Sequence, residues 1–410
     1  MSNTAVDFSI PNLGEPKILS PIHMSRSIGD GLADYVSDAT RVLFSMETQQ
    51  GPDGHPVPVD ESTLELAGPR EKIYFNPARV HAAIATCGGI CPGLNNVIRA
   101  VVRCFWYRYG VRRISGIPYG YQGLLENSPY PIIPLDPDIV DDIQEKGGTI
   151  LGSSRGGGDR VSEIVDSLER MNVNILVTVG GDGTLRGAWD LGEEIKRRGL
   201  KISVIGVPKT IDNDLSFIQS SFGFDTAVAQ AVPVVRGAHI EARNSINGIG
   251  LVKVMGRASG FIAANTSLAQ SDVNFCLIPE NPFDLEGENG FLGHLKKRIL
   301  DRGHAVILLA EGAGQNLLPA TKEKDASGNV KFQDIGLFLR DQIQAYFKKE
   351  KVEVNIKYID PSYIIRSVPA DSFDSIYCAR LGAHAVHAAM ARLKPSSASG
   401  TTSMYIFLSR

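Results

Sequence analysis

The sequence predicts an α/β protein in which parallel strands are joined by helices. From Val80 onward, short apolar runs alternate with segments long enough to form helices. This alternation is typical of parallel sheets with right-handed crossovers. Glycine- or aspartate-rich turns follow several of the apolar runs, and in open parallel sheets ligands bind beyond the carboxyl ends of the strands. We therefore expect the functional residues to lie in these turns.

Six apolar runs are the expected strands, and the last long segment is an expected helix. The strands are placed near Val80–Thr86, Ile114–Ile117, Ile175–Val179, Ile202–Val207, Gly250–Val254 and Ala305–Ala310. The helix is expected to bury one face, because its apolar residues recur at helical spacing. These residues are Ile376, Ala379, Ala383, Val386, Met390 and Leu393.

Residues 1–78 differ in composition from the rest and are expected to form an N-terminal extension. They mix Pro, Gly, Asp and Ser, with one amphipathic stretch near Leu32 to Leu43. The run from Gln49 to Asp60 is typical of an exposed linker. The regular alternation of strands and helices begins only after this extension.

Length and charge restrict the class of protein. A chain of 410 residues predicts two or three domains at roughly 100–200 residues each. The chain carries 42 Lys and Arg against 45 Asp and Glu, a formal net charge of −3, and no run of like charge stands out. This balance argues against a nucleic-acid or membrane-surface partner. Anionic substrates would then be bound by local basic groups.

Several features predict a cytoplasmic protein. No stretch approaches the ~18 consecutive apolar residues of a membrane span, and Met1 to Ser20 lacks the charged and then apolar profile of a signal peptide. The five cysteines are odd in number and irregularly spaced, which suits a reducing compartment. Cys87 and Cys91 flank a glycine turn without a second pair of ligands, so packing is favoured over zinc binding.

The segment from Leu176 to Thr184 is the most informative motif. It reads Leu-Val-Thr-Val-Gly-Gly-Asp-Gly-Thr, an apolar strand that runs into a glycine turn, and a helix is expected from Leu185 to Arg198. The three glycines lack a Cβ, so their backbone could approach phosphate oxygens and take up positive φ. Asp182 could hold Mg²⁺ together with substrate phosphates. The alternative is an ordinary strand-to-helix turn.

Two further glycine-rich segments could contact phosphate. Thr86 to Asn95 forms a glycine turn between an expected strand and an expected helix, and Leu151 to Arg160 places Arg155 beside a run of glycines. Guanidinium groups bind phosphate oxygens bidentately. A solvated flexible loop is the alternative for the second segment.

A carboxylate-rich turn follows the strand that ends at Val207. It reads Pro-Lys-Thr-Ile-Asp-Asn-Asp from Pro208 to Asp214. Phosphoryl transfer to an alcohol needs a carboxylate that accepts the hydroxyl proton. Asp212 is the candidate base, with Asp214 as its supporting carboxylate. An aspartate- and asparagine-rich helix cap is the alternative.

A fourth group of polar residues is scattered along the second half of the chain. It combines cations, a phenol and a carboxylate, which a sugar phosphate requires for its phosphate and its hydroxyl groups. Its members are Met255-Gly256-Arg257, Ala310-Glu311-Gly312, Lys357 and Tyr363-Ile364-Ile365-Arg366. Singly, each is more often a surface charge or part of a structural pair.

Four of these motifs resemble the 6-phosphofructokinase family, in the same order along the chain. They are Gly-Gly-Asp-Gly at 180–183, Pro-Lys-Thr-Ile-Asp-Asn-Asp at 208–214, Met-Gly-Arg at 255–257 and the Tyr-Ile-Ile-Arg run that ends at Arg366. The first motif is also similar to NAD kinases and lipid kinases, whereas the second and third are not. The resemblance covers roughly Pro77 to Leu393.

The resemblance implies two Rossmann-like three-layer α/β/α domains of phosphofructokinase type, preceded by the N-terminal extension. Residues 79–223, completed by about 365–400, would bind the nucleotide, and residues 224–364 would bind the sugar phosphate. A homo-oligomer, either a dimer or a tetramer, would be expected. The family contains allosteric enzymes, but bacterial ATP-dependent members carry an interface arginine where this chain has Gly248, so their regulation cannot be carried over.

The resemblance also implies roles for residues at matching positions. ATP would contact Gly88, Arg155, Gly156, Gly180, Gly181, Asp182, Gly183, Thr184 and Lys209, with Mg²⁺ on Asp182. Asp212 would accept the hydroxyl proton, with Thr210, Asp214 and Arg257 as catalytic partners. Fructose 6-phosphate would be held by Thr210, Ile211, Asp212, Met255, Gly256, Arg257, Glu311, Lys357, Tyr363, Ile364, Ile365 and Arg366.

The implied reaction is the glycolytic transfer of a phosphoryl group to the 1-hydroxyl of fructose 6-phosphate, but two residues favour different donors. In this family a glycine at the position of Gly183 goes with ATP and an aspartate goes with pyrophosphate, because a carboxylate would repel the nucleotide α-phosphate. Lys209 resembles the lysine of pyrophosphate-using members. ATP users resembling plant and protist enzymes carry both residues, so ATP is the expected donor and pyrophosphate the alternative.

Two further points bear on the resemblance. After Leu393, the runs Pro395–Gly400 and Met404–Leu408 do not look like the family, whose members usually continue further. A non-catalytic regulatory or sensor subunit of the same fold is another alternative. Such a subunit would be expected to have lost a metal or base carboxylate, whereas Asp182 and Asp212 are both present.

Overall fold

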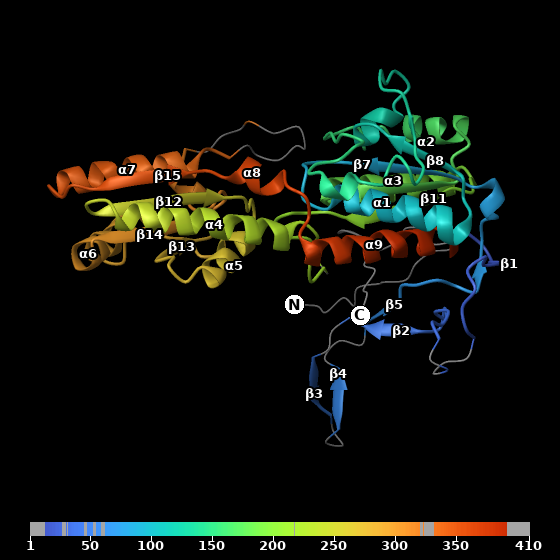
Figure 1. Ribbon diagram of the computed structural model, residues 1–410, viewed down its shortest axis with the longest axis horizontal. Coiled ribbons are helices and arrows are strands. Elements are labelled where there is room, and N and C mark those ends of the chain that lie inside the picture. The colour runs from blue at the N-terminus through green and yellow to red at the C-terminus, as the bar shows by residue number, and fades with distance from the viewer. Residues whose placement is uncertain are drawn as a thin grey trace. The chain divides into compact units, whose positions relative to one another are not determined.

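The computed structural model describes residues 13–26, 30, 32–44, 47–51, 55–58, 62–216, 218–319, 323 and 332–391. These residues belong to two compact units (Figure 1). Unit 1 contains the chain up to Lys209, Leu215–Ile218 and the chain from Ser375 onward, and unit 2 contains Thr210–Asp214 and Gln219–Asp374. Each unit is built around one largely parallel sheet, so the predicted α/β class is confirmed.

The sheet of unit 1 has five strands in the order β11-β10-β7-β8-β9. The strands are β7 (His81–Thr86), β8 (Arg113–Ile117), β9 (Ile133–Pro134), β10 (Ile175–Gly180) and β11 (Ser203–Pro208). All neighbours are parallel except the short β9, which pairs antiparallel with β8. The chain leaves β7 for β8 on one side and later adds β10 on the other side. The switch point, where ligands bind in such sheets, therefore lies between β7 and β10.

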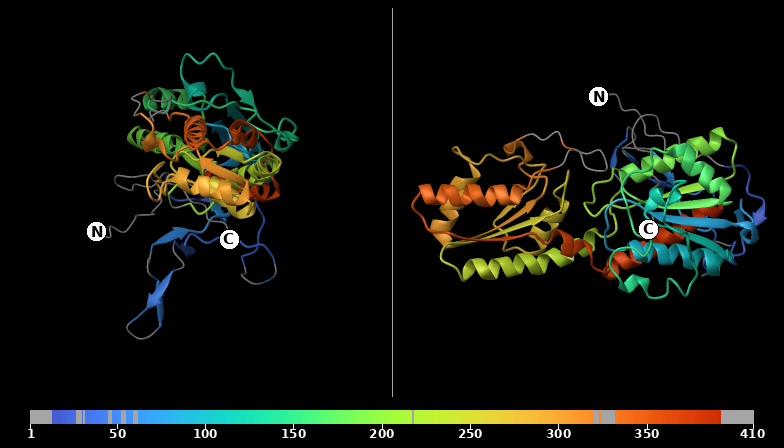
Figure 2. Two further views of the ribbon diagram at one scale, coloured as in Figure 1. Left: turned by 90° about the vertical axis from the view of Figure 1, so that its left-hand side faces the viewer. Right: turned by 90° about the horizontal axis from the view of Figure 1, so that it is seen from above.

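Helices cover both faces of this sheet (Figure 2). Hydrophobic residues of α2 (Val161–Arg170) and α3 (Asp182–Arg197) pack on one face. On the other side lie α1 (Leu94–Arg103), which continues into a π-helical segment (Cys104–Tyr109), and α9 (Ser372–Ala391). Burial on both faces explains why the strands are continuous apolar runs rather than alternating ones.

Unit 2 repeats the same architecture with a smaller sheet. Its four strands are parallel in the order β13-β14-β12-β15. They are β12 (Gly248–Val254), β13 (Phe275–Leu277), β14 (His304–Ala310) and β15 (Asn355–Ile359). One face carries α6 (Phe291–Arg302) and α7 (Ile335–Lys349). The other carries α4 (Phe224–Arg243), α5 (Phe261–Ala269) and α8 (Ser362–Arg366).

The described part of the N-terminal extension consists of short antiparallel strand pairs. They are β1 (Ile18–Leu19) with β6 (Lys72–Ile73), β2 (Arg41–Leu43) with β5 (Thr63–Glu65), and β3 (Thr48–Gln50) with β4 (Pro56–Pro58). The amphipathic stretch near Leu32 to Leu43 does not bury an apolar face, since these two leucines are 70% and 45% exposed. Within the run from Gln49 to Asp60, Gln49 and Gln50 are exposed as expected. Thr48–Gln50 pairs antiparallel with Pro56–Pro58, so this region contains a strand pair where an unstructured linker was predicted.

The apolar face predicted for the last helix is only partly right. Val386 and Met390 are buried, whereas Ile376 and Ala379 are exposed and Ala383 is half-buried. The buried stripe begins instead with Cys378 and Leu381. Gly382 allows this face to pack closely on α1, because a Cβ added at Gly382 would lie 2.7 Å from Ala100 Cβ. In an alanine-rich helix such a close approach decides the packing, and hydrophobic periodicity is a weak guide to it.

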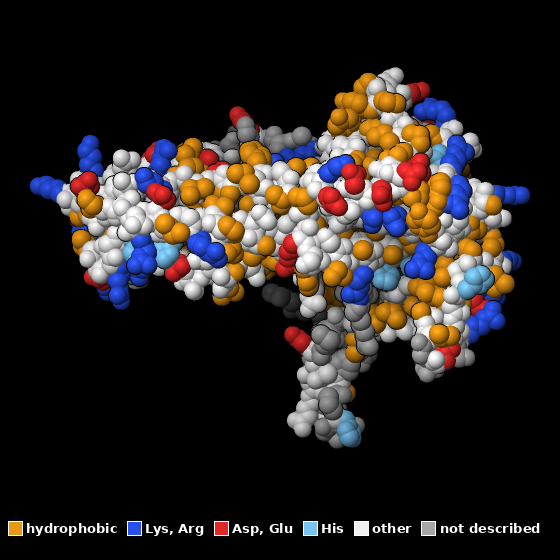
Figure 3. Space-filling model, in the orientation of Figure 1, with side chains coloured by type: hydrophobic (Ala, Val, Ile, Leu, Met, Phe, Trp, Pro, Cys, Tyr) orange, Lys and Arg blue, Asp and Glu red, His pale blue; other side chains and the backbone are white. Residues whose placement is uncertain are grey.

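All six expected strands are present, and β13 and β15 are additional strands that the sequence pattern did not indicate. Leu393 and the atypical runs 395–400 and 404–408 lie outside the described residues. No helix among the described residues has the length and hydropathy needed to cross a membrane. Lys, Arg, Asp and Glu side chains are interspersed over the face shown in Figure 3.

Candidate active site

Residues 180–184, which were expected to contact the phosphoryl donor and which we call the donor loop, connect β10 to α3 in unit 1. β10 ends at Gly180, Gly181 is the N-cap of α3, and Asp182 is the first helical residue. Thr184 N and Leu185 N both donate to Gly181 O, at 2.9 and 3.0 Å. The loop therefore presents the N-terminus of a sixteen-residue helix, where backbone N–H groups and the helix dipole favour a bound anion.

The glycines of the donor loop permit close packing and leave open space, and none of the three adopts the positive φ that was expected. A Cβ at Gly180 would lie 2.2 Å from Thr184 Oγ1, so Gly180 allows the buried Thr184 to pack against the loop. In contrast, apart from its chain neighbours and the adjacent backbone of α3, no described atom lies within 4 Å of the Cβ position at Gly183. Gly183 thus leaves room for a ligand beside the start of α3.

A second turn lies next to the donor loop, because β7 and β10 are neighbouring strands. It contains Gly88, which has a positive φ of 82°. Gly88 N donates to Ser154 O at 2.8 Å, and Ser153 Oγ donates to Gly88 O at 2.7 Å. These bonds place the exposed Arg155 and Gly156 immediately after a segment fixed to the Gly88 turn. The structure thereby brings all three predicted phosphate loops together.

Lys209 follows β11 and its side chain returns to the Gly88 turn. The residue is buried, and its Nζ donates to Gly89 O at 2.7 Å. The same Nζ lies 3.8 Å from the Cβ position at Gly88, and Lys209 O lies 3.4 Å from that at Gly181. We call the donor loop, the Gly88 turn, Arg155 and Lys209 the donor half-site. All of it belongs to unit 1.

Asp182 fits the role of a magnesium ligand. Its side chain is exposed at the first position of α3, beside the open space at Gly183. Mg²⁺ is usually bound through one or two carboxylates together with substrate phosphates and water. A single exposed carboxylate at an anion-binding helix N-terminus matches this donor set.

The acid turn, residues 210–214, belongs to unit 2 and is held by its own hydrogen bonds. Thr210 Oγ1 accepts from Asp212 N at 3.2 Å and donates to Asp214 Oδ1 at 2.7 Å. Asn213 adopts a positive φ of 55°, and its Oδ1 accepts from Ser221 N at 2.8 Å. The exposed Asp214 therefore orients Thr210, while the half-buried Asp212 is the carboxylate held closer to the protein interior.

Asp212 lies beside the arginine turn, which we define as residues 255–257 after β12. Asp212 Oδ2 accepts from Arg257 N at 3.4 Å, and Ser259 Oγ donates to Asp212 O at 2.9 Å. Gly256 has a φ of 128°, and a Cβ there would lie 2.4 Å from Ser259 O. Glycine at position 256 is thus required by a tight backbone turn that approaches the acid turn.

The turn that follows β14 packs tightly on the arginine turn. Glu311 N donates to Val254 O and Gly312 N donates to Gly256 O, both at 3.0 Å. A Cβ on Gly312 would lie 1.9 Å from Arg257 O, so only glycine fits there. The acid turn, the arginine turn and Glu311 together form what we call the acceptor half-site.

Glu311 is surrounded by charged groups of unit 2. Burial raises the pKa of its carboxyl, and the nearby cations Lys253 and Arg257 act in the opposite direction. Asp360 also raises this pKa and Arg366 lowers it, so Arg366 lies close enough to Glu311 to affect it electrostatically. Glu311 is therefore a carboxylate set among several cations, a combination that a phosphorylated sugar requires.

Arg366 has a buried hydrogen-bond donor that no described residue satisfies. Its Nε is buried and makes no hydrogen bond to any residue that the structure describes. Its guanidinium lies over the Tyr363 ring, 4.7 Å from the centroid, and this ring is 75% exposed. A buried unsatisfied donor is costly, and a donor on a charged group more so. An anionic oxygen of a ligand would satisfy it.

Four other residues predicted to contact the sugar have side chains that are less well placed to bind a ligand. The side chains of Met255 and Ile365 are buried in the core formed with α4, and Ile211 packs partly against the same core. Ile364 is mostly exposed. For the two core residues, only the backbone is available to a ligand in this structure.

Lys357 is separated from the arginine turn within unit 2. It lies on β15 opposite Gly250 of β12. Met255 is five residues after Gly250 and directly follows the end of β12, which corresponds to ~17 Å at ~3.3 Å per residue. The structure therefore does not bring Lys357 together with Arg257.

Several residues that hold the site were not indicated by the sequence. They are Ser221 and Ser259 at the acid turn, Lys253 on β12 and Phe332 near Arg257. Serine, lysine and phenylalanine occur throughout the chain, and their contacts are made with residues distant in sequence.

Comparisons with known proteins agree with this architecture. A family described as Phosphofructokinase matches residues 81–389. An ATP-dependent 6-phosphofructokinase of Borreliella burgdorferi is 55% identical over 95% of this chain and 88% of its own. One of Amycolatopsis methanolica is 47% identical over 94% and 85%, and one of Trypanosoma cruzi is 44% identical over 95% and 79%.

Solved structures show the same fold. A pyrophosphate-dependent phosphofructokinase of Nitrosospira multiformis has a TM-score of 0.63 at 21% identity, covering 76% of this chain and 77% of its own. The two units and their turns thus define an α/β phosphotransferase fold. The chain belongs to the phosphofructokinase family.

Proposed function

We propose that this chain is an ATP-dependent 6-phosphofructokinase. It transfers the γ-phosphoryl group of ATP to the 1-hydroxyl of fructose 6-phosphate and gives fructose 1,6-bisphosphate and ADP. The proposal is supported by relatives of that name at 44–55% identity over 94–95% of the chain. In this proposal unit 1 binds the donor and unit 2 binds the acceptor.

The observation that carries the choice of donor is the open space at Gly183. Apart from its chain neighbours and the adjacent backbone of α3, no described atom lies within 4 Å of its Cβ position, so a nucleotide phosphate could approach the backbone there. An aspartate would place a negative charge in this space and repel the α-phosphate. Lys209 is compatible with either donor, because its ammonium is held at Gly89 O in the Gly88 turn and would supply positive charge to either anion.

The donor half-site would position the triphosphate and neutralise its charge. The backbone N–H groups at the start of α3 would face phosphate oxygens, and Arg155 and Lys209 would supply positive charge. Mg²⁺ on Asp182 would add further charge neutralisation when it is bound. Positioning and electrostatic stabilisation of this kind provide most of the catalysis in phosphoryl transfer.

The acceptor half-site would activate and orient the sugar. Asp212 would accept the proton of the 1-hydroxyl, and Asp214 would keep Thr210 oriented through their 2.7 Å hydrogen bond. Arg257 and Arg366 would bind anionic oxygens, and Glu311 would accept hydrogen bonds from sugar hydroxyls. This assignment gives each polar group of the half-site a separate role.

The proposal extends to assembly and location. The enzyme would be a homo-oligomer, either a dimer or a tetramer, in the cytoplasm. The five cysteines are free thiols, and burial raises the pKa of Cys87 to about 11 and that of Cys104 to about 12. Unreactive thiols suit a reducing compartment.

A coupled assay with separate donors tests the function. Purified protein is given fructose 6-phosphate and Mg²⁺ with either ATP or pyrophosphate, and ADP or bisphosphate formation is followed. We expect turnover with ATP and little or none with pyrophosphate. Turnover with pyrophosphate alone would reverse the assignment of the donor, and binding without turnover would favour a sensor subunit.

A further inference from the structure

Three consecutive residues before α7 each contact a part of unit 2 that carries the acceptor half-site. We call Phe332, Gln333 and Asp334 the anchor segment. None of them belongs to a motif that the sequence singled out. Phe332 contacts Arg257, and Asp334 contacts Lys253 on β12. Gln333 is linked to the backbone of Glu311 through the side chain of Gln315.

Phe332 forms the first contact. The Arg257 guanidinium carbon lies 4.5 Å from the centroid of the Phe332 ring, and both side chains are half-buried. A guanidinium over an aromatic face is attracted by the ring quadrupole, more strongly where water is partly excluded. The ring therefore favours one orientation of this long side chain.

Gln333 ties the segment to the Glu311 turn. Gln315 Nε2 donates both to Glu311 O, at 2.8 Å, and to Gln333 O, at 3.1 Å. Gln333 Nε2 donates to Pro319 O at 2.6 Å. One amide group thus bridges the turn that bears Glu311 and the segment that bears Phe332.

Asp334 fixes the other end of the segment. Lys253 Nζ lies 2.9 Å from Asp334 Oδ2 and 2.9 Å from Asp360 Oδ2. Lys253 is buried and stands two residues before Met255 on β12. Asp334 is also the N-cap of α7, where its side chain accepts from two backbone N–H groups. The anchor segment is therefore held at a fixed place beside the strand that leads into the arginine turn.

We propose that Phe332 is a positioning residue that orients the Arg257 guanidinium for the phosphorylated acceptor, and that Asp334 holds Phe332 in place through Lys253. This inference rests on the proposed function, since it assumes that Arg257 binds the acceptor. Ordering a flexible side chain before binding reduces the entropy lost when the ligand arrives. The effect should appear in acceptor binding and leave donor binding unchanged.

The test replaces the aromatic face while keeping the apolar volume. Phe332→Leu should raise KM for fructose 6-phosphate by about 3- to 10-fold, the range expected for a partly desolvated cation–π contact. KM for ATP and kcat should stay within about twofold of wild type. Phe332→Tyr keeps the π face and should restore the wild-type KM. Leu337→Ala, at an exposed position on the first turn of α7, is the matched control and should change neither KM.

A binding measurement provides a readout that does not depend on turnover. In a calorimetric titration with fructose 6-phosphate alone, Phe332→Leu should bind the sugar phosphate about 3- to 10-fold more weakly than wild type, the same range as expected for KM. Asp334→Asn should weaken binding less, because asparagine still caps the helix and loses only the charge that pairs with Lys253.

Particular results would overturn the inference. The first is an unchanged affinity of Phe332→Leu for fructose 6-phosphate. The second is an equal loss of affinity for ATP and for fructose 6-phosphate. The third is a Phe332→Tyr variant that binds fructose 6-phosphate as weakly as Phe332→Leu. A wild-type protein that neither binds nor phosphorylates fructose 6-phosphate would instead refute the proposed function. An active wild type with an unaffected Phe332→Leu variant would refute the positioning role alone.

Discussion

At the scale of single residues, the acid turn gives its two carboxylates different surroundings. Asp214 is exposed and accepts a hydrogen bond from Thr210, which fixes the turn. Asp212 is half-buried, and its Oδ2 faces the backbone N–H of Arg257. We therefore propose that Asp212 accepts the proton and that Asp214 supports the turn.

Removing the charge of Asp212 should affect chemistry more than binding. We expect Asp212→Asn to lower kcat by ~10²–10⁴, the range for loss of a general base, while KM for both substrates changes little. Asparagine retains an oxygen that can accept from Arg257 N, so the turn should be preserved. Steady-state kinetics with ATP and fructose 6-phosphate measure this effect. A kcat within about threefold of wild type would show that another group accepts the proton.

The open position at Gly183 should determine the use of ATP. Gly183→Asp should reduce kcat/KM for ATP strongly, since the added carboxylate would lie near the α-phosphate with little screening. The fold should tolerate the change, because an acidic residue in the first turn of a helix interacts favourably with the helix dipole. Gly183→Ala is the control and should retain most of the activity. Equal losses in both variants would mean that crowding, and not charge, excludes the nucleotide.

Arg366 should act selectively on the sugar phosphate. Truncation to alanine removes a charge-assisted contact of roughly 1.5–3 kcal/mol, so KM for fructose 6-phosphate should rise about ten- to a hundredfold with little change in KM for ATP. Arg366→Lys keeps the charge without the planar fork and should fall between wild type and alanine. Kinetics at fixed saturating ATP measure the effect. If Arg366→Ala weakened both substrates to the same extent, Arg366 would serve the structure.

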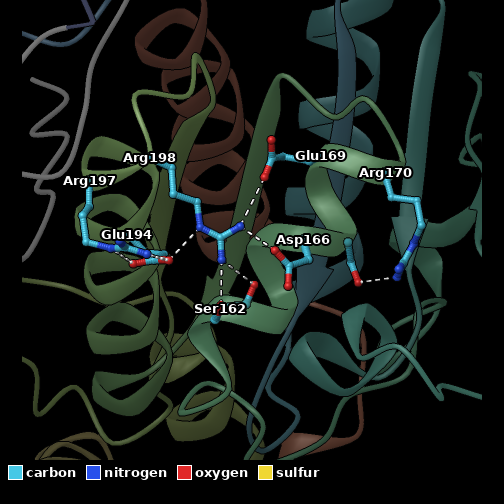
Figure 4. A network of polar contacts seen from close by, with 8 residues as sticks. Ser162, Asp166, Glu169, Arg170, Glu194, Arg197 and Arg198 are labelled. Atoms are coloured by element: carbon cyan, nitrogen blue, oxygen red, sulfur yellow. Dashed lines mark hydrogen bonds and ion pairs between the residues drawn. The ribbon is translucent and has the colours of Figure 1, made fainter.

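At the scale of elements, α2 and α3 are joined by a charged network (Figure 4). Arg198, at the end of α3, donates to Glu194 of the same helix and to Asp166, Glu169 and Ser162 of α2. Its side chain is largely buried for a charged residue. The network links the helix that begins at the donor loop to the helix packed beside it.

This network predicts a pH-dependent stability. Hydrogen bonds from Arg197 and Arg198 lower the pKa of Glu194 to about 2, compared with an ordinary value of 4.5. Because the pKa is lower in the folded state, Glu194 stabilises the fold above about pH 4.5, and this contribution is lost as the pH falls toward 2. Urea unfolding of wild type and Glu194→Gln should therefore differ most near neutral pH and converge on acidification. A difference that does not change with pH would contradict this assignment.

Close packing of α4 on β12 explains one departure from the bacterial members of the family. A Cβ at Gly248 would lie 2.1 Å from Ala242 O near the end of α4. A side chain as long as arginine could not be accommodated there without a shift of the backbone. Gly248 is therefore fixed by the packing of unit 2, and this chain cannot use that position for an interface arginine.

At the scale of the whole molecule, the sequence predicted the parts of the fold that depend on local pattern. The six expected strands are continuous apolar runs because both faces of each sheet are covered by helices. β13 and β15 were missed since the first has three residues and the second contains Asn355 and Lys357 at a sheet edge. The strand pairs of the N-terminal extension are short and depend on partners distant in sequence.

The residues of the candidate site likewise fall into those that a local sequence pattern marks and those that it does not. Glycines and carboxylates directly after strands could be recognised, and the structure gathers most of them at the carboxyl ends of β7, β10, β12 and β14. Ser221, Lys253 and Phe332 act through contacts with residues between 8 and 81 positions away or across separate turns. No spacing rule relates such residues, so a single sequence could not indicate them.

Identification of the products tests the central claim most directly. Purified protein, fructose 6-phosphate, ATP and Mg²⁺ are incubated, and the phosphorus resonances are followed by NMR. We predict that ATP is converted to ADP while a second phosphate ester appears on carbon 1 of the sugar in equal amount. Release of inorganic phosphate with unchanged sugar, or no reaction while pyrophosphate supports bisphosphate formation, would contradict the proposal that this chain is an ATP-dependent 6-phosphofructokinase.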